Sequence, residues 1–340
     1  MQSHRRSDSA YYIIMTKTAF VTGSTGFIGL NLIEALSNED WHVYALHRAT
    51  SDLTYLKRFE VHRVIGSVRD YDALLVAMPE QPDAVFHLAA NTSAWSKHNR
   101  EQYEDNVRGT RNMLKAALAK KAKKLIYTSS VSSFGIHHER IDENTPSNAE
   151  TCGINYHLTK YLAEKEVAKA VDKGLDAVIL NPCHVLGPYD KSNWSQLIQL
   201  VYRDKLPGIP PGTGTFGHVK DVVQAHIKAV EKGKTGEKYL LGGVEASFLQ
   251  VIQTIQKMLD KPLSRKATPV WVFQLVLWSS MFRSVFSSQE PLLTPEKFKF
   301  VTEKVLCNAE KAQQELDYQT STLEKMLSDA YGWLYAEGWL

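Results

Sequence analysis

The segment 18–29 restricts the possible folds of this 340-residue chain more than any other feature. A short apolar run at 18–22 is followed directly by a glycine-rich turn at 23–29, and apolar residues then recur at helical spacing from 30 to 36. A strand, a glycine turn and a helix in this order are typical of a nucleotide-binding unit, in which a pyrophosphate lies on the helix N-terminus. An ordinary strand-to-helix turn is the alternative interpretation.

The glycines of this turn have distinct roles in such a unit. Gly23 permits the tight turn, Gly26 lets the backbone approach a pyrophosphate, and Gly29 lets the helix pack close to the sheet. The other residues of the turn that we predict at the cofactor are Thr25, Phe27 and Ile28.

Strand-like and helical patterns alternate along the rest of the chain. Apolar, strand-like runs lie at 41–46, 61–65, 84–88, 124–128, 177–180 and 238–241. Helical patterns between them include 105–119 and 160–173. The alternation predicts an α/β fold with a doubly wound parallel sheet of the Rossmann type, which binds ligands beyond the carboxyl ends of its strands. A chain of this length also has room for a smaller, mainly helical C-terminal substrate lobe.

Arg48 lies two residues after the second strand-like run and nineteen residues after Gly29. An acidic residue near this position would bind the ribose hydroxyls of NAD, whereas an Arg accommodates the 2′-phosphate of NADP. We therefore expect NADP(H) as the cofactor in preference to NAD(H), with a surface Arg at a strand end as the alternative interpretation.

These patterns divide the chain into five expected regions. They are a flexible tail (1–16), an NADP-binding Rossmann domain (17–186), a substrate-lobe segment (187–216), a return to the Rossmann sheet (217–243) and a C-terminal substrate lobe (244–340). Within the lobe segments we expect a helix at 193–202 and a loop rich in Pro and Gly at 207–217. The apolar stretch 269–286 is interrupted by polar residues, so a helix of the lobe or a pocket roof is expected, with a membrane-surface contact as the alternative.

Charge and cysteine content exclude several other classes of protein. The net charge is +3 and both signs are mixed along the chain, so no nucleic-acid surface is expected. The three cysteines, Cys152, Cys183 and Cys307, lack metal-ligand spacing, which indicates no metal site and favours the reducing cytoplasm. We expect a small-molecule substrate and a monomer or homodimer.

Tyr156 and Lys160 are four residues apart at the start of a helical pattern. Positions i and i+4 share one face of a helix, so the ammonium can lie beside the phenol and lower its pKa. Such a Tyr can act as a general acid or base, although many pairs of this kind merely decorate a solvated helix. About twenty-six residues earlier, the run 127–135 places several hydroxyl side chains at the end of a strand.

The order of these motifs resembles the extended branch of the short-chain dehydrogenase/reductase superfamily, and within it the dihydroflavonol-4-reductase-like group. The resemblance covers the chain from Lys17 onward and implies that Tyr156 donates a proton to a substrate carbonyl. It also implies that Lys160 lowers the pKa of Tyr156 and holds the nicotinamide ribose. Ser130 would orient the substrate oxygen, with Ser129 and Ser132 close enough in sequence to be mistaken for it.

The same resemblance and the expected position of the cleft supply the remaining candidate contacts. Further cofactor contacts are expected at Val68, Leu88, Ala89, Ala90, Thr128, Pro182, His184 and Val185. Substrate contacts are expected at Thr92, Trp95, Ser130, Phe134, Trp194 and Phe216. Ordinary core packing is the alternative for the aromatic residues, and a structural histidine is the alternative for His184. Asn106 would hold a water or the active-site helix, or serve as a cap.

The resemblance implies an NADPH-dependent reductase of aldehydes or ketones, reversible as an alcohol dehydrogenase. Nucleotide-sugar epimerases and dehydratases share the core and the catalytic trio, but this chain has Asn181-Pro182 and Thr215-Phe216-Gly217 where they commonly carry diphosphate-binding arginines. The segment 131–135 also lacks the Asn that plant flavonoid reductases use for substrate selection. A hydroxysteroid-type dehydrogenase and a non-catalytic NADP-sensing protein are further alternatives, although relatives of the last kind typically lose the Tyr or the Lys.

Overall fold

A parallel sheet forms the centre of the computed structural model, which describes residues 16–285 and 293–340. Its strands are β1 (Thr18–Thr22), β2 (His42–His47), β3 (His62–Ile65), β4 (Ala84–His87), β5 (Leu125–Thr128), β6 (Ala177–Pro182) and β9 (Lys238–Leu241). They follow the order β3-β2-β1-β4-β5-β6-β9, and every neighbouring pair is parallel. The order reverses between β1 and β4, which is where a doubly wound sheet binds its ligand. The expected tail, apart from Thr16, lies outside the described residues.

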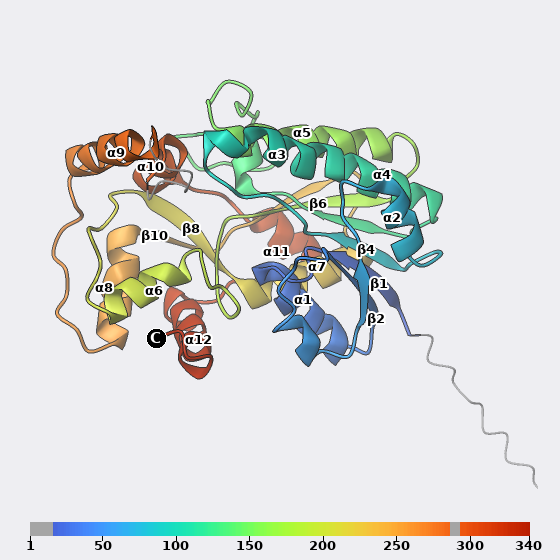
Figure 1. Cartoon of the computed structure of the whole chain (residues 1–340), viewed down its shortest axis with the longest axis horizontal. Coiled ribbons are helices and arrows are strands. Elements are labelled where there is room, and N and C mark those ends of the chain that lie inside the picture. The colour runs from blue at the N-terminus through green and yellow to red at the C-terminus, as the bar shows by residue number, and fades with distance from the viewer. Residues whose placement is uncertain (1–15, 286–292) are drawn as a thin grey trace, which may run out of the picture.

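Both faces of this sheet are covered by helices, which explains why its central strands β1, β4, β5 and β6 are buried without alternation. In β1, Ala19 and Val21 belong to one core cluster and Phe20 belongs to the other. The first face carries α1 (Phe27–Asn38), α7 (Val219–Lys232) and α11 (Glu310–Leu316), and the second carries α2 (Tyr71–Ala77), α4 (Gly109–Ala119) and α5 (Asn155–Val171) (Figure 1). Short helical segments are η1 (Leu56–Arg58), η2 (Ser96–His98), α3 (Asn99–Tyr103), the π-helix η3 (Glu104–Arg108) and η4 (Val131–Phe134).

A smaller lobe lies beside the sheet and contains its own apolar core. Its helices are α6 (Ser195–Tyr202), α8 (Phe248–Met258), α9 (Val270–Val285), α10 (Pro295–Thr302) and α12 (Leu323–Ala336). Its strands are β7 (His184–Leu186), β8 (Thr213–His218), β10 (Val244–Ser247) and β11 (Lys304–Val305). Strand β8 pairs with all three of the others, so segments from distant parts of the sequence meet on it.

The predicted loop at 207–217 is wrong in its C-terminal part, because β8 begins at Thr213. Glycine normally weakens a strand, but Gly214 is required here by packing. A Cβ at this position would lie 2.2 Å from Cδ2 of His184 on the neighbouring β7. Tertiary contact therefore overrides the local preference for a turn.

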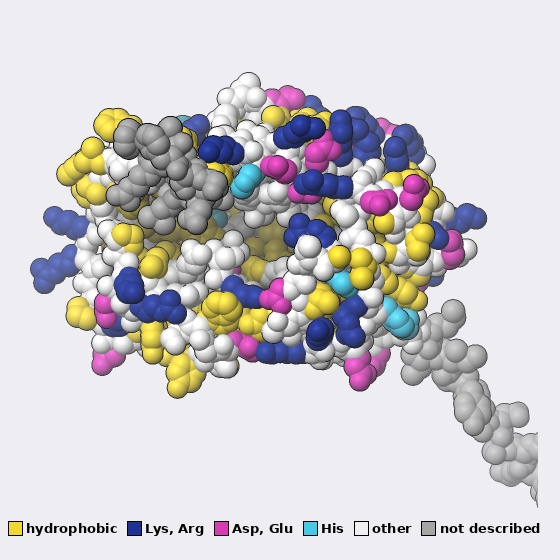
Figure 2. Space-filling model, viewed as in Figure 1, with side chains coloured by type: hydrophobic (Ala, Val, Ile, Leu, Met, Phe, Trp, Pro, Cys, Tyr) yellow, Lys and Arg dark blue, Asp and Glu magenta, His cyan; other side chains and the backbone are white. Residues whose placement is uncertain are grey.

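The apolar stretch 269–286 forms α9, as expected for a helix of the lobe. Nothing helical within the described ranges combines the length and apolarity needed to cross a bilayer. On the face drawn in Figure 2, basic and acidic side chains are interspersed, and the surface is hollowed between the sheet and the lobe.

Candidate active site

A cleft of about 480 Å³ lies where β1, β2, β3 and β4 end. The predicted cofactor contacts that line it are Gly23, Thr25, Gly26, Arg48, Val68, Leu88, Ala89 and Ala90, together with the predicted substrate contact Thr92. The sequence interpretation did not include the lining residues Leu46, His47, Ser51, Gly66, Ser67, Asn91, Ser93 and Asp105. Nearly all of these lie at or just beyond a strand end, which is the signal that could have identified them.

The glycine turn is shaped for close approach of a phosphate to the backbone. Gly23 has φ of +69°, and a Cβ there would lie 2.8 Å from the backbone N of Ala89. Gly26 is the N-cap of α1, so Phe27 and Ile28 belong to the first turn of that helix, whose N–H groups have no partner within the helix. These residues fit the pyrophosphate of a dinucleotide.

We expect Gly29→Ala to destabilise the protein and to weaken nucleotide binding. A Cβ at Gly29 would lie 2.1 Å from the carbonyl O of Gly23, so the turn itself has to move. Overpacking of this kind costs about 1–3 kcal/mol of unfolding free energy, which urea denaturation measures. Gly332→Ala in α12 is the control, because a Cβ there meets nothing within 4 Å. A Gly29→Ala protein as stable as this control would contradict the steric role of Gly29.

Arg48 lies at the rim of this cleft, directly after β2. Its backbone N donates to Oγ of Ser51 at 3.1 Å, which fixes the turn that carries it. Its side chain is exposed, and the guanidinium makes no ion pair within the part of the chain that the structure describes. An arginine in this situation has its hydrogen-bond donors available for an anion.

Tyr156 and Lys160 lie on the first two turns of α5, as their spacing predicted. Lys160 is buried, and its Nζ donates to the carbonyl O of Thr128 at 2.8 Å and lies 5.2 Å from the ring centre of Tyr127. Burial lowers the pKa of Lys160 to about 8, and the nearby carboxylate of Glu164 opposes this shift. The ammonium of Lys160 is therefore hydrogen-bonded to the last residue of β5.

The expected lowering of the Tyr156 pKa is not seen. Burial raises the pKa of Tyr156 to about 12, although a hydrogen bond with the Ser130 side chain acts in the opposite direction. The physical reason is desolvation of the phenolate, while the ammonium of Lys160 is directed at the backbone of Thr128. In this arrangement the Tyr156 hydroxyl holds its proton near neutral pH.

Ser130 is the serine that the structure brings to Tyr156. It is partly exposed, caps η4, and its Oγ accepts the backbone N–H of Ser132 at 3.1 Å. Ser129 is buried and donates to the carboxylate of Glu164 at 2.5 Å, and Ser132 is also buried. Among the three predicted serines, Ser130 is the one that is partly exposed and lies near the Tyr156 side chain.

Glu164 was missed in the sequence although it continues the face of α5 that carries Tyr156 and Lys160. It is buried and accepts hydrogen bonds from Ser129 and from Nδ2 of Asn181 at 2.7 Å, and it pairs with Lys238. Asn181 also donates to the carbonyl O of Ser130 at 3.0 Å. This polar cluster joins α5, β6 and β9 beneath the strand end that carries Ser130. The repeated i+4 spacing was the available signal.

Asn106 connects helix α5 to the wall of the cleft. It lies in the π-helix η3, where its side chain exchanges hydrogen bonds with the backbone of Asn91 at 2.7 and 2.9 Å. Its Nδ2 also donates to Oγ1 of Thr159 at 3.1 Å. Short π-helical segments such as η3 are rare and are frequently found at functional sites. The contact with α5 matches one of the roles expected for Asn106.

Several predicted contacts lie in the protein interior. Thr128, Pro182, Val185, Phe134 and Phe216 are buried, and their assignments to cofactor or substrate stay predictions. His184 is enclosed by aromatic rings, with centroids 4.6 Å from Trp194 and 5.2 Å from Phe216, and burial lowers its pKa to about 4. Trp194 also stacks on Phe248 at 5.2 Å, so it too belongs to the core of the lobe.

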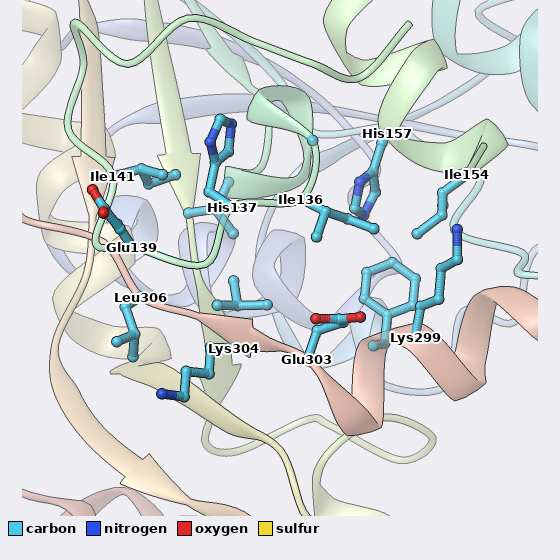
Figure 3. A pocket seen from close by; sticks show the side chains of 14 residues that line it. Ile136, His137, Glu139, Ile141, Ile154, His157, Lys299, Glu303, Lys304 and Leu306 are labelled. Carbon is cyan, nitrogen blue, oxygen red and sulfur yellow. The ribbon is translucent and has the colours of Figure 1, made fainter. Parts of the chain in front are cut away.

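Two further cavities flank the turn that carries Tyr156. One of about 340 Å³ is lined by the predicted substrate contact Trp95, by Asn155 and Leu158, and by Met281 of α9. The other is shown in Figure 3 and has a volume of about 30 Å³; His157 reaches it from α5 and Glu303 from the opposite side. This second space has room for about one water, so only the first is large enough for a substrate group.

Comparisons with known proteins agree with this geometry. Residues 19–242 match the profile of the NAD dependent epimerase/dehydratase family. A Synechocystis sp. protein provisionally named dihydroflavonol 4-reductase is 30% identical over 97% of this chain and 98% of its own length. UDP-glucose 4-epimerase from Vibrio cholerae is 27% identical over 77% of this chain and 81% of its own length. The crystal structure of gox2253 superposes with a TM-score of 0.82 at 29% identity, covering 95% of this chain and 99% of that one.

Proposed function

The chain belongs to the NAD dependent epimerase/dehydratase family, and from this premise we propose that it is an NADPH-dependent reductase of aldehyde or ketone carbonyls. The observation that carries the proposal is the proximity of the Ser130 hydroxyl to Tyr156, both at partly exposed positions, with Lys160 one turn further along α5 and hydrogen-bonded to Thr128. The dihydroflavonol-4-reductase-like character of the relatives supports the direction of the reaction.

The residues of the site have different roles in the proposed carbonyl reduction. A bound nicotinamide cofactor supplies the hydride that the carbonyl carbon accepts. Ser130 and Tyr156 bind the carbonyl oxygen, where negative charge develops, and such oriented donors contribute strongly to catalysis. Tyr156 then gives its proton to that oxygen, which yields the alcohol. Because burial raises the pKa of Tyr156 to about 12, its hydroxyl is protonated beforehand, which suits reduction.

The cofactor would bind along the cleft at the strand ends. The turn from Gly23 to Gly29 would hold the pyrophosphate, and Lys160 would hold the nicotinamide ribose. Arg48 supports NADP(H) over NAD(H), because its guanidinium is exposed at the cleft rim beyond β2.

A nucleotide-sugar epimerase or dehydratase is the second candidate, because the family profile and the Vibrio cholerae relative carry such names. Where those enzymes commonly carry an arginine, this chain has Asn181. Its amide is occupied by Ser130, Ser133 and Glu164 inside the protein, which disfavours a diphosphate contact there.

A turnover assay separates the two candidates. We expect the purified protein to oxidise NADPH with members of a panel of aromatic and aliphatic ketones and aldehydes. Conversion of a UDP-sugar with no net cofactor oxidation, and no carbonyl-dependent loss of NADPH absorbance, would establish the epimerase instead.

We expect Arg48→Ala to raise the KM for NADPH by about tenfold or more while changing the KM for NADH little, because it removes a charge-assisted partner of the 2′-phosphate. Arg63→Ala is the matched control, since Arg63 is an exposed arginine on the neighbouring β3. Equal losses for the two cofactors would refute the role of Arg48.

A further inference from the structure

Helix α9 exposes a continuous apolar face. Trp271, Leu275 and Trp278 follow i, i+4, i+7 spacing and are 65%, 52% and 62% exposed. Leu277 lies on the opposite face and is buried at 8%. Of the eleven large hydrophobic residues that are exposed among the described residues, six belong to this helix. The helix is therefore apolar on both sides, and the protein covers one of them.

A helix with apolar side chains on two opposite sides normally contacts protein or lipid on both of them. The other exposed hydrophobic residues, such as Ile65, Val76 and Tyr335, are far apart in the sequence and need no partner. On α9 they form one patch, which Figure 2 shows as hydrophobic side chains at the upper left. A contiguous patch of this kind marks an interaction surface.

The charges around the patch indicate what covers it. Residues 261–289 contain no Asp or Glu and four basic residues. Arg265 and Lys266 are exposed in the loop that leads from α8 into α9. Figure 2 shows Lys and Arg side chains protruding at the same edge of the molecule, below α9. Lys261 pairs with Asp204 at 2.7 Å, so Arg265 and Lys266 are the exposed basic residues that this loop places beside the tryptophans.

We propose that α9 docks this protein on the surface of a bilayer that contains anionic lipids. Trp is enriched at the level of the lipid headgroups, and Lys and Arg near the surface are attracted to anionic lipids. The helix would lie in the interface with Trp271, Leu275 and Trp278 toward the acyl chains.

The docking face is connected to the candidate active site. Met281 of α9 lines the cavity of about 340 Å³ whose other walls include Trp95, Asn155 and Leu158, beside Tyr156. A bilayer against α9 would therefore lie close to this cavity. If the proposed carbonyl reductase function holds, the expected substrates are apolar carbonyl compounds that partition into membranes; the docking itself does not depend on that function.

Sedimentation with vesicles tests the docking. We expect the full chain to bind vesicles of phosphatidylcholine mixed with phosphatidylglycerol and to bind pure phosphatidylcholine more weakly. The double variant Trp271→Ser/Trp278→Ser should lower the partition coefficient by at least about tenfold. Arg265→Glu/Lys266→Glu should lower it by at least about tenfold on the anionic vesicles, an effect that salt weakens.

Tyr335→Ser is the matched control, because Tyr335 is a 66% exposed aromatic residue on α12. This variant should bind vesicles as the native chain does. Circular dichroism and urea unfolding of each variant verify that it is folded, without requiring cofactor binding or turnover. Failure of the native chain to bind anionic vesicles would overturn the proposal. A native dimer in gel filtration that the tryptophan variant converts to a monomer, with no vesicle binding, would assign the face to a second copy instead.

Discussion

Tyr156→Phe is expected to lower kcat for carbonyl reduction by about a hundredfold to ten-thousandfold, the usual contribution of a general acid. The substitution removes the proton that the substrate oxygen receives and leaves the ring in place. Cofactor affinity should be nearly unchanged, because the glycine turn and the rim of the cleft are untouched. Steady-state kinetics and fluorescence titration with NADPH measure the two quantities separately.

Tyr161→Phe provides the control for this experiment. Tyr161 lies on the same helix, and its ring packs under Nζ of Lys165 at 4.3 Å, away from Ser130. It should retain kcat within a few-fold. A Tyr156→Phe enzyme that keeps a native kcat would remove the proton-donor role from the mechanism, and NADPH binding would show whether the cofactor site survives it.

Acidification is expected to destabilise the fold by about 5 kcal/mol between about pH 7.5 and about pH 5.5. Burial lowers the pKa of His87 to about 3 and those of His157, His184 and His226 to about 4. In the unfolded chain these groups titrate near ~6.5, so the unfolded state binds more protons in this range. Stability is therefore present above pH ~6.5 and is lost as the pH falls toward ~4.

Urea unfolding at the two pH values measures this loss. His226→Gln should reduce the pH dependence by roughly one quarter, because one of the four buried groups no longer titrates. The amide can replace the contacts of the imidazole with Oγ1 of Thr128 and the carbonyl O of Val222. His138→Gln is the control, since His138 is exposed. An unfolding free energy that is equal at both pH values would contradict the burial of these histidines as neutral groups.

Local sequence pattern was sufficient to predict the strands of the parallel sheet and the glycine turn that follows β1. The seven strands of the sheet lie within a residue or two of the predicted runs, because each is a buried apolar segment bounded by turn residues. The glycine turn could also be placed, since the requirement for three glycines between a strand and a helix is itself local. The cytoplasmic location and the assignment of the site residues remain predictions.

Contacts between distant segments could not be predicted in the same way. Gly214 belongs to a strand because His184, thirty residues earlier, packs against it. Glu164 matters because Ser129, Asn181 and Lys238 converge on it from three different elements. The spacing on α5 could have indicated Glu164 itself, but its distant partners, like the His184 that packs on Gly214, are brought there by the fold and cannot be identified from local spacing.

The sequence by itself determined the α/β architecture, the glycine turn between β1 and α1 and the pairing of Tyr156 with Lys160 on one helical face, because these follow from periodicity and spacing. The tertiary structure decided the protonation of the pair. Burial beside Thr128 and Ser130 raises the pKa of Tyr156 and lowers that of Lys160, since desolvation disfavours both charged forms. It also decided that α9 presents two tryptophans to the outside, because exposure depends on which neighbours a helix acquires and not on its composition.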